Sequence, residues 1–132
     1  MKRFHLVFGL VLVIVFLLTG QYMDRFHNHL EGMADGPRML YRSRHIYILL
    51  TGLLHLAMGS YITDRVQTKQ RTLQLIGSLM LTIAPVLFIL AFFKEPNLTG
   101  LDNPFSQKGV YLVAAGVLLH LISGVKEGNK PI

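Results

Sequence analysis

Four long apolar stretches, each close to the length needed to cross a bilayer, occupy most of this 132-residue chain. They cover residues 6–23, 45–62, 73–93 and 109–125. A helix needs about 20 mostly apolar residues to span ~30 Å of hydrocarbon. Because a soluble chain of this size does not carry four such stretches, the sequence predicts an all-α membrane protein with one integral membrane domain over residues 1–132.

The first apolar stretch follows two basic residues, Lys2 and Arg3, which is also how a signal peptide begins. Its end, Leu18-Thr19-Gly20, is a poor site for cleavage by a signal peptidase. We therefore expect an uncleaved first transmembrane helix.

The distribution of charge predicts the orientation in the membrane, because basic residues favour the cytoplasmic side. With the N-terminus inside, the inner segments hold seven basic residues and the outer segments six, while five of the seven acids lie outside. The inner basic residues are Lys2, Arg3, Arg65, Lys69, Arg71, Lys126 and Lys130, and the outer acids are Asp24, Glu31, Asp35, Glu95 and Asp102. Short connections make successive helices antiparallel. We expect an up-down-up-down bundle of four helices with both termini in the cytoplasm.

Composition excludes several classes of function. The chain has no Cys, so it has no thiolate ligand or Cys nucleophile. Its net charge of +6 comes from residues that flank the apolar stretches, which favours anionic lipid over nucleic acid as the partner. Walker, Rossmann, HExxH and Gly-x-Ser-x-Gly motifs do not occur. The sequence favours a binding or accessory protein without catalysis of its own, in a larger membrane complex or a homo-oligomer.

Small residues recur every seven positions along three of the predicted helices. They are Gly52 and Gly59; Gly77, Ala84 and Ala91; and Gly109, Gly116 and Ser123. Such stripes let membrane helices approach closely, and they also leave room for a flat ligand. Pro85 predicts a kink in the third helix, because it removes one backbone donor and crowds the carbonyl four residues earlier.

Two histidines, His55 and His120, lie beside these stripes, 11 residues after Arg44 and 12 after Lys108. This spacing predicts that both lie at matched depth, near the middle of the bilayer. Two such imidazoles can ligate a haem iron from opposite sides. In architecture and in this ligand pair the chain resembles four-helix b-type cytochromes such as the cytochrome b561 group, which implies a haem b electron carrier. The alternative is that each histidine hydrogen-bonds a neighbouring helix.

Basic and polar residues gather at the predicted outer end of the second helix. Asp35-Gly36-Pro37 reads as a helix start, which extends this helix over residues 37–62. The inward stripe then continues through Arg38, Arg42 and His45, with Arg44 just off it. Tyr22 and Glu95 should lie at the same level. Three interpretations stay open: a salt-bridge lock of Arg42 or Arg44 with Glu95, a site for an anion or lipid headgroup, and a docking face for a partner protein.

His27 and His29 form a His-x-His pair in the predicted long outer loop. In an extended segment both imidazoles can reach one metal ion. Histidines of this kind are more often surface residues without a metal.

The chain also resembles small uncharacterised four-helix proteins of bacterial inner membranes. The resemblance rests on Thr19-Gly20-Gln21-Tyr22-Met23 and Arg42-Ser43-Arg44-His45-Ile46-Tyr47. It implies a location and a fold but no activity.

Overall fold

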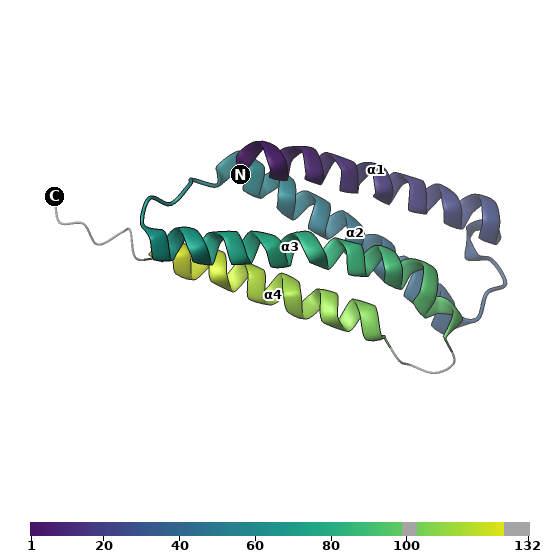
Figure 1. The fold of residues 1–132 in the computed structure, drawn as a ribbon. Coiled ribbons are helices and arrows are strands. Elements are labelled where there is room, and N and C mark those ends of the chain that lie inside the picture. The colour runs from purple at the N-terminus through teal and green to yellow at the C-terminus, as the bar shows by residue number, and fades with distance from the viewer. Residues whose placement is uncertain (99–102, 126–132) are drawn as a thin grey trace.

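The computed structural model, which describes residues 1–98 and 103–125, is a bundle of four long helices (Figure 1). Among the described residues the elements are α1 (Lys2–His27), the short η1 (Asn28–Leu30), α2 (Asp35–Tyr61), α3 (Thr68–Lys94), the short η2 (Glu95–Asn97) and α4 (Pro104–Val125). The predicted all-α class is confirmed. Asp102, Lys126 and Lys130, which entered the charge argument, lie outside the described residues.

The helices extend beyond the apolar stretches that predicted them. α1 continues to His27 instead of ending near residue 23, and α4 begins at Pro104 instead of near residue 109. The reason is that a helix ends where its backbone is capped, not where its hydrophobicity stops. At the end of α1 the cap is Asn28, whose φ of 43° places it in the left-handed region.

The bundle consists of two helix pairs, α1 with α2 and α3 with α4, joined by contacts between α2 and α3. Figure 1 shows α1 alongside α2 and α3 alongside α4. Small residues form the tightest contacts. A Cβ on Gly59 would lie 2.5 Å from Cγ of Leu6, and one on Gly116 would lie 2.9 Å from the carbonyl oxygen of Gly77. The prediction that the small-residue stripes pack helix against helix is therefore confirmed at these positions.

Three helices are long and apolar enough to cross a membrane: Lys2–Leu30, Thr68–Asn97 and Pro104–Val125, where the first and second include the short helices that follow. Large apolar side chains such as Val7, Leu17, Leu79 and Leu118 are exposed along their sides. α2 falls short because Arg44, His45 and His55 lower its mean hydropathy. The fourth predicted span is thus not among those that length and composition identify.

Candidate functional site

The interior of the bundle contains two polar clusters, one built around Arg44 and one around His55. We call them the arginine cluster (Arg44, Glu95, Ser106, Asn103 and Ser43) and the histidine cluster (His5, His55, Ser78 and His120). Burying polar side chains is costly unless they are hydrogen-bonded. Both clusters meet that requirement, but in chemically different ways.

The arginine cluster centres on a buried ion pair. Nε of Arg44 donates to Oε2 of Glu95 over 2.7 Å, and the two side chains are 7% and 0% exposed. Nη1 of Arg44 donates to Ser43, and Nη2 donates to both Asn103 and Ser106 at 2.7 and 2.9 Å. Four of the five guanidinium N–H groups are thus used. Among the described residues the remaining one, on Nη1, has no hydrogen-bond partner.

Glu95 also caps the N-terminus of α4. Its Oε1 accepts from the backbone N–H groups of Phe105 and Ser106, at 2.9 and 2.8 Å, and its Oε2 accepts from the Ser106 hydroxyl at 2.8 Å. These N–H groups have no partner within the helix, and they carry the positive end of the helix dipole. With Arg44, the carboxylate holds four donors and its hydrogen-bonding capacity is filled.

The predicted salt-bridge lock to Glu95 is therefore present, and Arg44 forms it. Arg44 was placed just off the inward stripe, and Arg42 on it, but the structure buries Arg44 and leaves Arg42 exposed. Sequence reasoning missed Asn103 and Ser106. Asn103-Pro104 is a recognisable helix start and could have indicated that polar groups collect there.

The other residues predicted for this site have separate partners. Arg38 pairs with Asp35 one turn away, and Arg42 lines a different cavity of about 410 Å³ beside Asp24 and His29. His45 stacks on Phe16 with ring centroids 4.0 Å apart, and its Nδ1 lies 2.9 Å from the Thr19 hydroxyl.

Tyr22 packs edge-on against Phe92 and Phe93. The structure thus brings together Arg44 and Glu95 of the predicted set and separates the others.

The segment with His27 and His29 is a tight turn and not an extended strand. Asn28, His29 and Leu30 all have positive φ. His29 pairs with Asp24, whereas the ring of His27 packs against Tyr22 and Tyr41. Among residues 1–98 and 103–125, no group of three His, Asp or Glu side chains is arranged to hold a metal ion. A metal shared by His27 and His29 stays a prediction.

The histidine cluster is a chain of hydrogen bonds that touches all four helices. Nδ1 of His5 on α1 lies 2.8 Å from Nδ1 of His55 on α2, and Nε2 of His5 lies 3.1 Å from the hydroxyl of Ser78 on α3. The same hydroxyl lies 3.2 Å from Nε2 of His120 on α4. His5 and His55 are fully buried.

This chain of hydrogen bonds ends at the backbone carbonyl of Leu81, which has no partner within α3 because of Pro85. Pro85 has no N–H to donate to Leu81 four residues earlier. Nε2 of His55 lies 3.0 Å from that carbonyl oxygen and donates to it instead. His55 is therefore the group that satisfies the backbone where α3 is interrupted by proline.

This geometry differs from the predicted haem site in two respects. Both ring nitrogens of His55 are hydrogen-bonded, to His5 and to Leu81, so neither is free for an iron ion. α3 and α4 also pack closely beside His120, since a Cβ on Gly77 would lie 2.9 Å from Cδ2 of that ring. The residues in this arrangement do not fit a haem between His55 and His120, and the haem stays a prediction.

The predicted depth of the cluster also changes. His55 lies six residues before the end of α2, which is about 9 Å along the helix. His5 lies in the first turn of α1. The cluster therefore sits nearer the end of the bundle that holds the N-terminus than its middle. Sequence reasoning missed His5 and Ser78, because the partner of His55 comes from a helix with no small-residue stripe.

Both clusters reach the surface between α2 and α4. One cavity of about 470 Å³ is lined by Arg44 and Tyr47 from α2 and by Ser106, Gln107 and Tyr111 from α4. A second, of about 400 Å³, is lined by Leu54 and Met58 from α2 and by Val117, His120 and Leu121 from α4, with Leu81 of α3 also contributing. We call this face the α2/α4 groove. It is open because α4 packs mainly on α3.

Comparison with known protein families, with curated proteins and with solved structures gave no match. The resemblances to cytochrome b561 and to bacterial inner-membrane proteins therefore gain no support from them.

Proposed function

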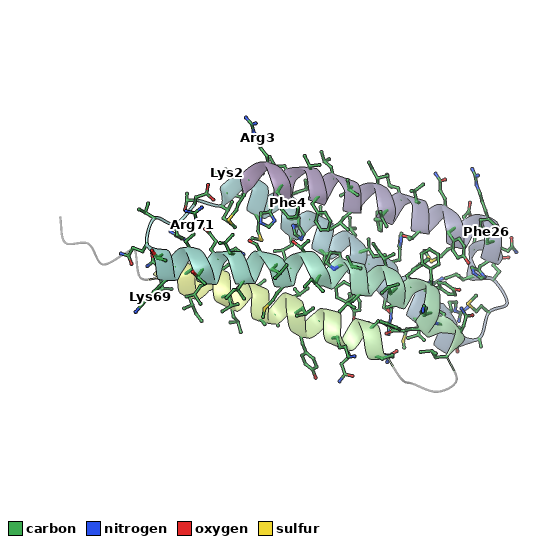
Figure 2. The ribbon with its side chains drawn as sticks, in the orientation of Figure 1. Lys2, Arg3, Phe4, Phe26, Lys69 and Arg71 are labelled. Carbon is green, nitrogen blue, oxygen red and sulfur yellow. The ribbon has the colours of Figure 1, made fainter. Side chains whose placement is uncertain are left out.

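We propose that the protein is an integral membrane protein whose four helices all cross a bacterial inner membrane, up-down-up-down, with both termini in the cytoplasm. Three helices have the length and hydropathy of membrane spans. Figure 2 shows Lys2 and Arg3 of α1 at the same end of the bundle as Lys69 and Arg71 of α3, and Phe26 at the other. Such a concentration of basic residues favours the cytoplasmic side.

For α2 the low hydropathy does not argue against a span, because its polar side chains do not face lipid. Arg44 is 6% exposed and His55 is fully buried, and both have hydrogen-bond partners inside the bundle. Polar residues in membrane helices are tolerated when they face the bundle interior and are paired.

We further propose that the protein binds a ligand or partner in the α2/α4 groove and does no covalent chemistry of its own. The observation that carries this is that each polar cluster reaches a groove cavity, the arginine cluster through Arg44, Asn103 and Ser106 at one end and the histidine cluster through His120 at the other. On α4, Ser106 beside Arg44 and His120 are 14 residues apart, or about 21 Å of helix. An apolar molecule about 20 Å long that lies along the groove therefore reaches a polar group at each of its ends.

At the Arg44 end the groove favours a hydrogen-bond acceptor without a net charge. Glu95 balances the charge of Arg44, and one N–H on Nη1 has no partner among the residues that the structure describes. A carbonyl group of a lipid or of a partner helix meets that requirement. Occupants of the groove are thus membrane lipid, a subunit of a larger membrane complex or a second copy of the chain.

Photo-crosslinking from positions in the groove tests this proposal. A benzophenone amino acid replaces Leu54 or Tyr111 in the groove, and Leu17 on the exposed face of α1 serves as the control. In native membranes we expect one discrete adduct from the groove positions and a mixture of bulk lipids from position 17. The same mixture from all three positions would show that the groove binds nothing selectively.

A further inference from the structure

The hydrogen bonds of the histidine cluster all run in one direction, from donor to acceptor, and the carbonyl at one end of the cluster sets that direction. The carbonyl oxygen of Leu81 can only accept a hydrogen bond, so His55 carries its proton on Nε2. In a neutral imidazole the other nitrogen is then an acceptor. Nδ1 of His55 therefore accepts, and the proton between the two rings belongs to Nδ1 of His5.

The donors and acceptors at the other end of the histidine cluster follow in the same way. With its proton on Nδ1, His5 accepts at Nε2, and the donor there is the Ser78 hydroxyl. A hydroxyl has one proton, so Ser78 accepts from its second partner, Nε2 of His120. When all three imidazoles are neutral, His120 is left with a lone pair on Nδ1.

The Nδ1 side of His120 faces away from α3. A Cβ on Gly77 would lie 2.9 Å from Cδ2 and 3.2 Å from Nε2 of the His120 ring, so the Cδ2–Nε2 edge is the one against α3. The ring lines the 400 Å³ cavity of the groove. The cavity wall around it is mostly apolar, with Leu54, Met58, Val117 and Leu121.

Two of the other polar side chains in this cavity, Gln74 and Ser123, are already engaged. Gln74 donates to the Thr63 carbonyl and accepts from the backbone N–H of Arg65, and the Ser123 hydroxyl donates to the backbone carbonyl of His120. Arg65 also lines the cavity and can only donate hydrogen bonds, whereas Nδ1 of His120 offers an acceptor to a ligand. A hydroxyl donor on an apolar body complements both the acceptor and the wall.

We propose that this cavity binds an apolar molecule bearing a hydroxyl group, an aliphatic alcohol or a phenol, whose O–H donates to Nδ1 of His120. The proposal rests on the proposed function of the groove and names the ligand class at one of its ends. A ketone or ether of the same shape presents only an acceptor and leaves Nδ1 without a partner, so it binds more weakly. An acceptor left unpaired by the bound ligand is what disfavours the ketone and the ether.

Two probes that differ only in the donor proton test the proposal: 4-nonylphenol and its methyl ether, 4-nonylanisole. Each is titrated into the protein in lipid nanodiscs, and the ¹⁵N signal of Nδ1 of His120 is followed by NMR. We expect the phenol to shift this signal and to bind about five- to tenfold more tightly than the ether, as one neutral hydrogen bond predicts. His120→Phe should remove that preference, whereas His29→Gln at the exposed turn should keep it.

Each outcome decides a different point. Equal binding of phenol and ether, with no shift at Nδ1, overturns the hydroxyl assignment and leaves binding in the groove intact. Binding of neither probe overturns the ligand site and counts against the proposed function at this end of the groove. If His120→Phe does not fold, Val117→Phe replaces it, because it fills the cavity while leaving the hydrogen-bond chain in place. Loss of phenol binding in Val117→Phe supports the site, and unchanged binding contradicts it.

Discussion

The two polar clusters solve the same problem, burial of polar side chains between membrane-length helices, with different chemistry. In the arginine cluster a full positive charge meets a full negative charge and a helix N-terminus. In the histidine cluster, three imidazoles and a serine hydroxyl form a chain of hydrogen bonds that connects α4 through α3 to α1 and α2. In the first, the hydrogen-bonding capacity of Glu95 is filled and one N–H of Arg44 has no partner among the described residues, whereas the second has an acceptor left at its end.

The two clusters differ in what their loss costs and in what they offer to a ligand. A buried ion pair gives little net stability, but losing one partner is expensive because the other charge stays buried. A chain of hydrogen bonds between neutral groups costs less to break. Its direction leaves an acceptor at one end, to which a ligand can donate. We therefore assign the arginine cluster mainly to holding α4 in place, and the histidine cluster to ligand selection.

Removing the charge of Arg44 should have the largest effect. Arg44→Met leaves Glu95 buried without its ion partner, which is expected to cost about 3–5 kcal/mol of unfolding free energy. The measurement is unfolding in mixed micelles with rising SDS. The double variant Arg44→Met with Glu95→Met should regain part of the loss, and a double variant less stable than Arg44→Met would contradict this account of the cluster.

Breaking the histidine cluster at His55 should cost less. His55→Phe leaves the Leu81 carbonyl unpaired, with an expected loss of about 1–3 kcal/mol. The cost should shrink in a Pro85→Ala background, because the alanine supplies the missing helical N–H. A double-mutant cycle in the same SDS assay measures this coupling, and additive effects would mean that Pro85 and His55 act independently.

Gly77 gives a way to disturb His120 without removing it. Gly77→Ala places a methyl group 2.9 Å from both the Gly116 carbonyl oxygen and Cδ2 of His120. Overpacking of this kind costs about 1–3 kcal/mol, and it should displace His120 from Ser78. We expect the ¹⁵N signals of His120 to change and those of His45 to stay. Unchanged His120 signals would place that ring farther from α3 than the structure does.

Replacing Arg38, which forms an exposed ion pair with Asp35, should have the smallest effect on stability. It is the matched control for replacing the buried Arg44. Both side chains are accessible to solvent, so Arg38→Ala should change stability by no more than about 0.5 kcal/mol. A loss comparable to that of Arg44→Met would show that exposure does not separate the two arginines.

The sequence predicted the helical class and the close contacts well, because both follow from periodic patterns. Apolar stretches of bilayer length indicate long helices, and glycines seven residues apart indicate where helices touch. The helix ends were predicted less well, since capping by Asn28 or by Glu95 depends on groups outside the apolar pattern.

The sites were predicted only in part, because the sequence does not fix how each helix is rotated about its axis or which side chains pair across helices. The pattern located the ion pair with Glu95 but placed Arg42 inward, because a spacing of four residues does not fix helix rotation to within one position. It found His55 and His120 but missed His5 and Ser78, which connect them. Pairing across helices requires knowing which faces meet, and a single sequence does not contain that information.

The central claim is that the carbonyl freed by Pro85 aligns the histidine cluster, and ¹⁵N NMR of labelled histidines in nanodiscs tests it most directly. The account predicts a proton on Nε2 of His55 and of His120, a proton on Nδ1 of His5, and a through-hydrogen-bond coupling between the Nδ1 atoms of His5 and His55. The hydroxyl of Ser78 completes the path. A proton on Nδ1 of His55, or no coupling between the two rings, would contradict the account.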